Sequence, residues 1–331
     1  MLDRRQVLKA GAGLPLVAGS LPFAGAVARA QDAYPSRTVT IVAPFPAGGV
    51  ADYAARPLAA FLGERLKQNV VVENKPGAGG GVGHAYVARA QPDGYTIMVA
   101  LPSFAVIPEA NRLQNRPVNY ETSDFVPLAR MFADPPFFCV KKDAKWKTAQ
   151  ELIDDIKQNP GKIAYGSSGV FGTVHLATEM FLHAAGLKML HVPYQGGAPA
   201  VNALLSDQVP VIPTVVSNIK GQLDAGAVRP LVHWGNRPVT ALPGVPSLQD
   251  LGYKDVLYIL WSGVFAPAKT PERVQTVLRG AIKEFMQKPD VLAKFRQGGT
   301  EIGYMDGPDF GKFLEEDNAR LIAITRKIKL S

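Results

Sequence analysis

The sequence predicts an α/β protein in which parallel strands alternate with helices. Short runs of β-branched and apolar residues are followed by a glycine-rich turn and then by a segment with helical periodicity, and this unit recurs along the chain. The 331 residues are 47% hydrophobic and 19% charged, with 32 Gly and 27 Pro. This composition suits a globular α/β protein with many loops and a core large enough for two domains.

The first thirty residues differ from the rest. The basic segment MLDRRQVLKA precedes the apolar stretch GAGLPLVAGSLPFAGAV and an A-x-A cleavage pattern that ends at Ala30. Arg4 and Arg5 resemble the twin-arginine export signal, but Val7 stands where that signal most often has Phe, so ordinary Sec export is the alternative. The apolar stretch holds two prolines and is short of a full membrane span. We therefore expect a cleaved signal peptide at 1–30 and a periplasmic protein.

The charge of the remaining chain favours small anionic ligands. The expected signal peptide carries four basic residues and one acidic residue, so its removal lowers the net charge of +8 by three, to +5. The remaining Lys and Arg residues are dispersed without interleaved aromatics, which argues against nucleic acid as a partner. Cys139 is the only cysteine, so neither a disulfide framework nor a thiolate metal cluster is possible. It lies in the apolar run PFFCV and is expected to be buried in a strand.

The repeated units can be followed in order. The expected strands lie at 38–45, 69–74 and 96–100, then within the segments 162–172 and 188–197, each of which runs into a helix. Two amphipathic helices, at 270–286 and 306–328, end the chain. Alternating strands and helices give parallel sheets that are covered on both faces, with ligands at the carboxyl ends of the strands.

The alternation breaks around 101–135 and 236–262, both rich in Pro. Two breaks indicate two domains joined by two crossings, with the last helices returning to the first domain. We expect one lobe to comprise 31–132 and 258–331, and the other to comprise 133–257.

Three kinds of chemistry have weak support in the residues. The P-loop spacing is absent, and in GAGGGVG (77–83) the last glycine comes one position late for a dinucleotide fingerprint. Gly166-Ser167-Ser168-Gly169 lacks one residue of the nucleophile elbow, and a hydrolase built on Ser168 and His175 is kept only as an alternative. The five histidines are scattered without a metal-binding spacing, so no metal or cofactor is expected.

Two glycine loops that enter helices predict a binding site for a carboxylate. Each helix N-terminus offers unpaired N–H groups and a partial positive charge, and neither loop carries Arg or Lys, which a phosphate more often attracts. The small residues of these loops are Ala47, Gly48 and Gly49 in the first, and Ser167, Ser168 and Thr173 in the second.

The ordered motifs resemble those of the Bug-type periplasmic solute-binding proteins, the substrate-binding subunits of tripartite tricarboxylate transporters. The segments that carry the resemblance are YPSRTVTIVAPFPAGGVADYAARPLA, VVVENKPGAGGGVGHAYVARAQPDGYTIMVA, KIAYGSSGVFGTVHLATEMF, HVPYQGGAPAVNALLSDQV, LPGVPSLQDLGY and WSGVFAPAKTP. They span essentially all of the chain after the signal peptide. The resemblance implies a type II periplasmic-binding fold with two α/β lobes, two hinge crossings and a carboxylate in the cleft. It also implies delivery to a permease of one large and one small membrane subunit.

The resemblance also assigns ligand-binding positions. Family ligands are held by the loops that match Pro46–Gly49 and Ser167–Thr173, largely through backbone amides and waters. The implied contacts are Phe45, Ala47, Gly48 and Gly49 in the first loop, Ser167, Ser168, Gly172, Thr173 and His175 in the second, and Tyr194, Gln195 and Gly196 in a third. Asp52 matches an acidic residue of the family motif, and we interpret it as a structural partner of Arg56.

Departures from the family pattern bear on the substrate. Thr214 replaces an acid near the expected cleft, which removes a partner for an α-amino group. Phe171 is bulky where the family loop is small, and with Phe104 and Trp261 it could form an aromatic wall, although ordinary packing explains each of them equally well. We therefore expect a non-enzymatic, monomeric binding protein for a carboxylate with an apolar or aromatic body. The same sequence features also suit a periplasmic ligand sensor; a subunit of an ATP-driven importer is possible on the fold alone, although the family motifs argue against it.

Overall fold

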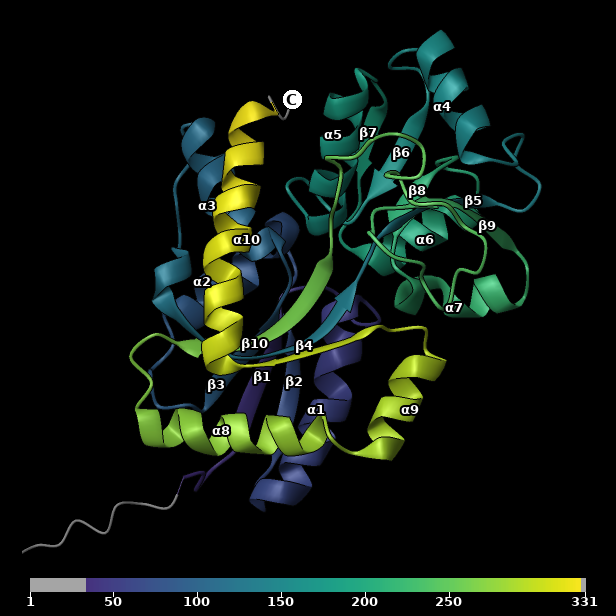
Figure 1. Ribbon diagram of the computed structural model, residues 1–331. Coiled ribbons are helices and arrows are strands. Elements are labelled where there is room, and N and C mark those ends of the chain that lie inside the picture. The colour runs from purple at the N-terminus through teal and green to yellow at the C-terminus, as the bar shows by residue number, and fades with distance from the viewer. Residues whose placement is uncertain (1–33, 329–331) are drawn as a thin grey trace, which may run out of the picture. The chain divides into compact units, whose positions relative to one another are not determined.

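The computed structural model describes residues 34–328, whose strands form two groups (Figure 1). The expected signal peptide, its cleavage site and the twin-arginine pair lie outside the described residues. From Tyr34 onward the chain forms one compact unit. The lobe limits expected from the sequence stay a prediction.

The first group is a six-stranded sheet in the order β11-β4-β10-β3-β1-β2. Strand β1 pairs in parallel with β2 and β3, as expected for repeated strand–helix units, whereas β10 is antiparallel to both β3 and β4. The bounds are β1 Val39–Ala43, β2 Val70–Asn74, β3 Thr96–Ala100, β4 Phe125–Asp134, β10 Leu260–Pro267 and β11 Ile302–Asp306.

The second group consists of a three-stranded sheet, β8-β5-β9, and a parallel pair, β6-β7. A parallel bridge between Tyr165 and Val211 connects the two. The bounds are β5 Phe137–Lys141, β6 Ala164–Ser167, β7 Leu190–Pro193, β8 Ile212–Thr214 and β9 Val228–His233. Cys139 is buried in β5, as expected.

Helices flank both groups of strands. With the six-stranded sheet lie α1 Val50–Leu66, α2 Gly81–Ala88, α3 Ser103–Leu113, α8 Glu272–Phe285, α9 Pro289–Gln297 and α10 Gly307–Lys327. With the second group lie α4 Ala149–Gln158, α5 Thr173–Ala185, α6 Gly197–Leu205 and α7 Val216–Asp224. The two closing helices predicted at 270–286 and 306–328 are confirmed as α8 and α10. We call these two sets of elements the first and the second lobe.

The chain passes between the lobes twice, and the two crossings differ in length. Between β4 and β5 only Pro135 and Pro136 intervene, whereas residues 234–259 connect β9 to β10. The long crossing is anchored where Trp234 donates its indole N–H to the carbonyl of Ala177 at 2.8 Å. The short crossing is therefore a stiff proline link and the long one a packed segment.

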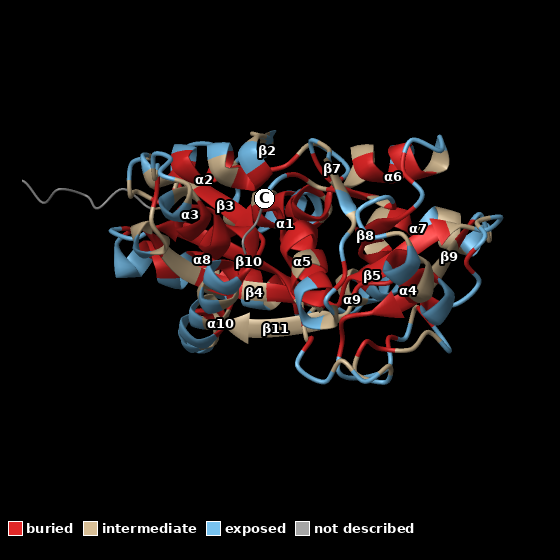
Figure 2. Cartoon of the chain, turned by 90° about the horizontal axis from the view of Figure 1, so that it is seen from above, coloured by how far each residue is buried: buried red, intermediate tan, exposed pale blue. Residues whose placement is uncertain are grey.

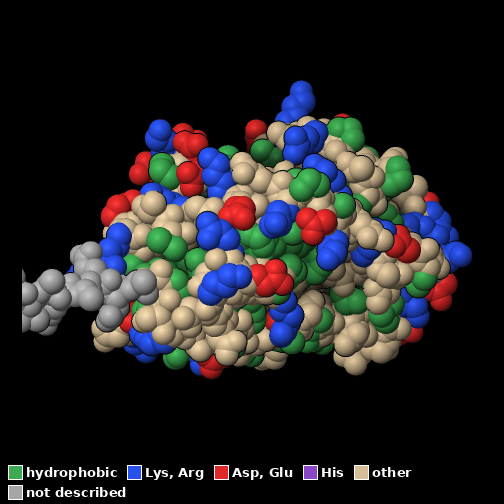
Figure 3. All heavy atoms as spheres, turned by 90° about the horizontal axis from the view of Figure 1, so that it is seen from below, with side chains coloured by type: hydrophobic (Ala, Val, Ile, Leu, Met, Phe, Trp, Pro, Cys, Tyr) green, Lys and Arg blue, Asp and Glu red, His purple; other side chains and the backbone are tan. Residues whose placement is uncertain are grey.

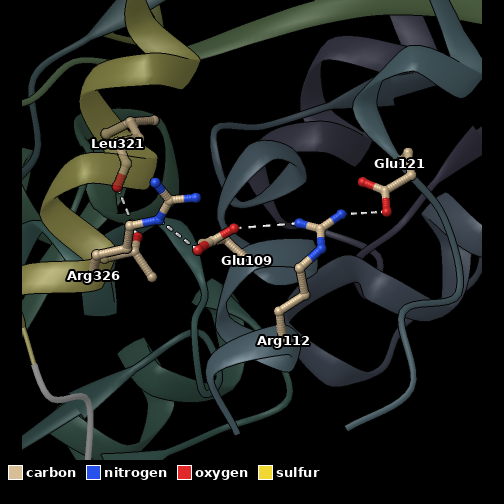
Figure 4. A network of polar contacts seen from close by, with 6 residues as sticks. Glu109, Arg112, Glu121, Leu321 and Arg326 are labelled. Carbon is tan, nitrogen blue, oxygen red and sulfur yellow. Dashed lines mark hydrogen bonds and ion pairs between the residues drawn. The ribbon is translucent and has the colours of Figure 1, made fainter. Parts of the chain in front are cut away.

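Strands β1, β3, β5 and β10 and the inward faces of the helices form the buried core in Figure 2, whereas the edge strands β2, β7 and β11 are partly exposed. A charged network at the periphery joins α3 to α10 (Figure 4). There the buried Glu109 accepts from Arg326 at 2.7 Å and from Arg112 at 3.3 Å, and Arg112 also pairs with Glu121. The hydrogen bond from Arg326, the largest influence, holds the pKa of Glu109 below its usual value.

Among the described residues, no helix is both long and apolar enough to cross a membrane. On the face seen in Figure 3, Lys and Arg side chains lie among Asp and Glu side chains and exposed apolar ones. That face therefore carries no unbroken basic patch of described residues.

Candidate functional site

The first loop of the site runs from the end of β1 at Ala43 to the start of α1 at Val50. Gly48 takes a positive φ of 79°, which glycine adopts without strain, and Gly49 is the N-cap of α1 without a capping side chain. The first N–H groups of a helix have no intrahelical partner. The turn therefore presents the positive end of α1 and a glycine backbone.

A network around a carboxylate holds this first loop. Asp52 is only 4% exposed and accepts hydrogen bonds from the backbone N–H of Gly48 at 3.0 Å, from Arg56 at 2.8 Å and from Asn74 at 2.9 Å. Asn74 also donates to the carbonyl of Phe45 at 3.0 Å. Burial raises the pKa of Asp52, but the three hydrogen bonds outweigh burial and hold it below its usual value. The expected Asp52–Arg56 pair is present, and Asp52 supports the loop from behind.

The second loop connects β6, which ends at Ser167, to α5, which begins at Thr173. Gly169 has a φ of 124° and Phe171 a φ of 59°, and Gly172 is the N-cap of α5, again without a capping side chain. The N–H of Gly172 donates to the carbonyl of Gly169 at 3.0 Å, which closes the turn. The loop presents the N-terminus of α5 in the same way as the first loop presents that of α1.

Uncharged rings hold the second loop. His175 accepts a hydrogen bond at Nδ1 from the N–H of Phe171 at 3.1 Å, and its ring stacks on His191 with centroids 3.9 Å apart. His191 in turn bonds Ser167 Oγ through Nε2 at 2.6 Å. Burial, with a smaller contribution from His191, lowers the pKa of His175 to about 3, and burial lowers that of His191 to about 4. Both imidazoles are therefore neutral at physiological pH.

A third glycine loop packs against the first. Gly196, with a φ of 151°, is the uncapped N-cap of α6, and a Cβ placed on it would lie 2.8 Å from Pro46 Cδ. Pro46 and residue 196 can therefore approach this closely only because residue 196 is glycine.

These helix N-termini line one small cavity between the lobes. Its volume is about 20 Å³, enough for about one water molecule. Among the described residues, three polar side chains and no charged side chain line it. The lining residues are Phe45, Gly49, Val50, Leu101, Ser168, Thr173, Val174, Gly197, Ala200, Pro213, Asn218 and Leu260. The arrangement offers backbone N–H donors and hydroxyls to an anion, and apolar walls to the rest of a ligand.

The lobes contact each other closely beside this cavity. The N–H of Ser103 donates to Thr173 Oγ1 at 3.2 Å, and Ser103 Oγ donates to the carbonyl of Gly79 at 3.0 Å. A Cβ on Gly79 would lie 2.7 Å from the carbonyl oxygen of Val170 and 3.2 Å from the nitrogen of Gly172. The cleft is therefore closed, with the short turn Ala78–Gly80 of the first lobe against the second loop.

The structure brings some of the predicted site residues together and places others elsewhere. Phe45, Gly49, Ser168 and Thr173 line the cavity. The remaining members of the three loops are not among the residues that line it: Ala47, Gly48, Ser167, Phe171, Gly172, His175, Tyr194, Gln195 and Gly196. Their ligand contacts stay predictions.

Three predicted residues on regular elements also lie outside the lining. Phe104 is 1% exposed and packs in an aromatic cluster with Tyr120, Phe125 and Phe265, and Trp261 is fully buried with its indole N–H on Asp317 at 2.9 Å. Thr214 is buried, and its hydroxyl has no partner among the described residues. The aromatic wall expected from Phe104, Phe171 and Trp261 is not part of this cavity.

Several lining residues were missed by the sequence analysis. Val50, Val174 and Gly197 directly follow predicted residues, so extending each loop by one position finds them. Pro213 and Leu260 directly precede the predicted Thr214 and Trp261 on their strands, where neighbouring side chains point to opposite faces. Leu101, at the end of β3, could have been found from the rule that ligands bind at strand ends. Ala200 and Asn218 carry no signal in the sequence.

The comparison with family models decides the identity of the chain. Residues 54–330 match the model of the tripartite tricarboxylate transporter family receptor. This chain belongs to that family. The receptor is 34% identical over 304 residues to a protein encoded in the tcbD–tcbE intergenic region of Pseudomonas sp. (strain P51), covering 91% of this chain and 87% of that protein. It is 31% identical to BugT of Bordetella pertussis, covering 82% of this chain and 83% of BugT.

Solved structures show the same two-lobe fold. The periplasmic binding protein BugD superposes with a TM-score of 0.83 at 31% identity, covering 90% of this receptor and 99% of BugD. Rpa4515 of R. palustris with adipate gives a TM-score of 0.83 at 30% identity, with 90% and 99% covered. MatC of Rhodopseudomonas palustris with bound malate gives 0.80 at 25% identity, with 88% and 100% covered. The family consists of periplasmic binding receptors of transporters and not of enzymes, as expected.

Proposed function

We propose that this receptor captures a small aliphatic carboxylate in the cavity between its lobes and delivers it to a tripartite permease. One observation carries the proposal: three helices contribute residues to one cavity, α1 from the first lobe and α5 and α6 from the second. Each of them has a glycine at its N-cap and therefore no capping side chain. Helix N-termini stabilise a carboxylate without a cationic side chain. The related structures of Rpa4515 with adipate and of MatC with bound malate both contain carboxylates.

The walls favour an aliphatic body over an amino acid. Phe45, Leu101 and Leu260 supply apolar surface, and Phe45 is the single aromatic ring in the described lining. Asp52 is the acid nearest in sequence to the lining residues Gly49 and Val50, and it is already engaged by Gly48, Arg56 and Asn74. An α-ammonium group would therefore enter the cavity without an acidic partner.

The proposed cycle consists of opening, capture and closure. A cavity for about one water cannot accept a dicarboxylate, so the lobes must separate before the ligand enters. The lobes then close around the ligand, less completely than in the form described here, and this closure is stabilised by the ligand's contacts with both lobes. The two crossings between the lobes, at Pro135–Pro136 and at 234–259, are the proposed hinges.

A thermal-shift and calorimetric panel tests the ligand class. Adipate, malate, hexanoate, citrate, aspartate and glutamate cover chain length, charge and the amino group. A ligand present at one hundred times its Kd stabilises by about 2.7 kcal/mol. Stabilisation by adipate or hexanoate is expected; tight binding of aspartate or glutamate alone would overturn the proposed class.

The double variant Gly49→Val plus Thr173→Ala tests the site. It places a side chain at the N-cap of α1 and removes a hydroxyl from the cavity, so binding of the panel ligand should be lost with the fold unchanged. Gly221→Val plus Thr240→Ala is the matched control, because Gly221 has open space around it and Thr240 is exposed. Equal affinity of the two double variants would contradict the site assignment.

Delivery and export need experiments in cells. Deletion of the gene should abolish uptake of the labelled ligand; if instead uptake persists and a transcriptional response to the ligand is lost, the protein serves a sensor.

For export, we propose the twin-arginine route. Replacing Arg4 and Arg5 with Lys should retain the precursor in the cytoplasm, whereas normal export of this variant indicates the Sec route.

A further inference from the structure

A second and much larger pocket lies beside the closed cleft. Its volume is about 830 Å³, within the roughly 300–1,000 Å³ typical of small-molecule sites. Helices α2 and α3 form its floor with Val82, Ala85 and Ile107, and the segment 116–120 completes one side. None of the residues lining it lines the cleft cavity.

The second lobe supplies one wall of this pocket. Val170 and Phe171, from the loop that enters α5, face the residues of α2 across the junction at Gly79. This loop touches the first lobe through the same contacts that close the cleft. The complete pocket therefore exists only while the lobes are closed.

The chemistry of the walls fits an anion with an apolar body. Val82, Tyr86 and Val170, which line the pocket, are 51%, 45% and 39% exposed and give its walls apolar surface. Arg89 and Arg116 line the same pocket, are exposed, and make no ion pair within residues 34–328. The third arginine, Arg37, is already paired with Asp93 at 2.8 Å. Two unpaired guanidinium groups beside apolar walls suit a carboxylate or sulfonate head with a hydrocarbon body.

We propose that this pocket, formed by α2, α3, Arg116 and the Val170–Phe171 segment, is a second binding site for a small organic anion with an apolar body. Its concavity favours a small molecule over a protein surface. Because such an anion contacts both lobes, it changes how far they close and with that the affinity of the cleft for its own ligand, and the cleft ligand changes the affinity of the pocket by the same factor. This coupling rests on the proposed function of the cleft, whereas the site itself does not.

Methyl NMR with octanoate tests the site directly. Val82, Val170 and Ile107 line only the pocket, whereas Val50, Val174 and Leu101 line only the cleft, so the shifted methyl groups locate the ligand. Octanoate at millimolar concentration should shift the pocket methyls, and neutral octanamide should bind more weakly. Shifts confined to the cleft methyls would instead show cleft binding and overturn the second site.

Charge reversal tests the arginines. Arg89→Glu plus Arg116→Glu should weaken octanoate binding at the pocket by at least about tenfold, because two attractive charges become repulsive. Arg273→Glu plus Arg296→Glu is the matched control, since both arginines are exposed on α8 and α9 outside the pocket lining and change the net charge equally. Equal weakening in both pairs, or none in either, would contradict the assignment.

A change on the second lobe tests whether that lobe contributes to the site. Val170→Asp should weaken octanoate at the methyls of Val82 and Ile107, although it alters no residue of the first lobe. If no probe shifts any pocket methyl, the small-molecule site is overturned. If in that case Arg89→Glu plus Arg116→Glu still abolishes cellular uptake of the cleft ligand, this face binds a protein partner.

Discussion

The two loops that face the cleft present helix N-termini in the same way but are supported by opposite electrostatics. Behind the first loop, an ionised Asp52 collects donors from Gly48, Arg56 and Asn74. Behind the second, neutral His175 and His191 stack on each other, and His175 accepts the N–H of Phe171. The first loop is thus held by an ionised carboxylate and the second by stacked neutral rings.

The two supports respond to pH in different ways. Protonating His175 places a hydrogen on Nδ1, which turns the acceptor of the Phe171 N–H into a donor and breaks that bond. The carboxylate of Asp52 has a lowered pKa, so it keeps its bonds at pH values where an ordinary aspartate is already partly protonated. Acid therefore weakens the two loops by opposite changes, a charge gained at His175 and a charge lost at Asp52.

Removing the charge behind the first loop should have the largest effect. Asp52→Ala leaves the Gly48 N–H without its acceptor, takes one partner from Asn74, and should lower the free energy of unfolding by about 3 kcal/mol, measured by urea denaturation. Arg56→Ala is the control: the Arg56 side chain is 55% exposed, so its loss should cost less than about 1 kcal/mol. Equal losses would show that the ion pair, and not the hydrogen bonds to the loop, carries the support.

The second loop can be tested by the pH dependence of one variant. His175 has a folded pKa of about 3 against a usual 6.5, so the unfolded chain takes up a proton first and the stability contribution is lost as pH falls below 6.5. His175→Asn keeps an acceptor near the position of Nδ1 and cannot be protonated. Relative to this variant, the wild type should lose about 2 kcal/mol between pH 7.5 and pH 5.

The variant difference is needed because buried Asp134 opposes the histidine. Burial raises the pKa of Asp134 to about 8, so its contribution to stability grows as pH falls and is the same in both proteins. Urea midpoints measured across this range for both proteins give the difference. A constant difference between wild type and His175→Asn would contradict the neutral-imidazole support.

The contact between the two loops is tested at Gly79. In Gly79→Ala the new Cβ meets the carbonyl of Val170 only in the closed form, so the lobes should open and carboxylate affinity should fall about tenfold, or about 1.4 kcal/mol. Small-angle scattering should show a larger radius of gyration. Gly226→Ala has nearly the same φ, 61° against 63°, with nothing within 4 Å, so it carries the strain without the contact. If both variants scatter alike, the contact does not control closure.

A charged network away from both loops should give the smallest effect. Glu109→Gln weakens the bonds to Arg326 and Arg112 in Figure 4 and should cost about 1 kcal/mol of stability, because both arginines are largely exposed. Calorimetric titration should find the carboxylate affinity unchanged. A loss of affinity would extend the binding machinery to the α3–α10 contact.

The strand–helix units were predictable because their signals are local. β-Branched runs ended by glycines at 38–49 and 162–172 predict the two loops of the cleft, and the structure has them. The antiparallel partner β10 was not predicted, because its pairing with β3 and β4 joins residues more than a hundred positions apart. Only the packed chain determines such pairings.

The site was predictable at its loops and less so on its strands. Gly49, Ser168 and Thr173 line the cavity because a glycine turn before a helix fixes where the backbone faces. On β8 and β10 the predictions fell on Thr214 and Trp261, whereas Pro213 and Leu260 line the cavity. Because strand side chains alternate, neighbouring positions on a strand point to opposite faces, and composition alone does not show which of them faces the cavity.

The size of the closed cavity also limits the rate at which the ligand associates. A ligand cannot enter a space for one water, so each association event must wait for the lobes to part. In rapid mixing, the observed association rate should rise with ligand concentration and then level off at the opening rate. Crystals grown in the closed form should, for the same reason, take up ligand by co-crystallisation and not by soaking.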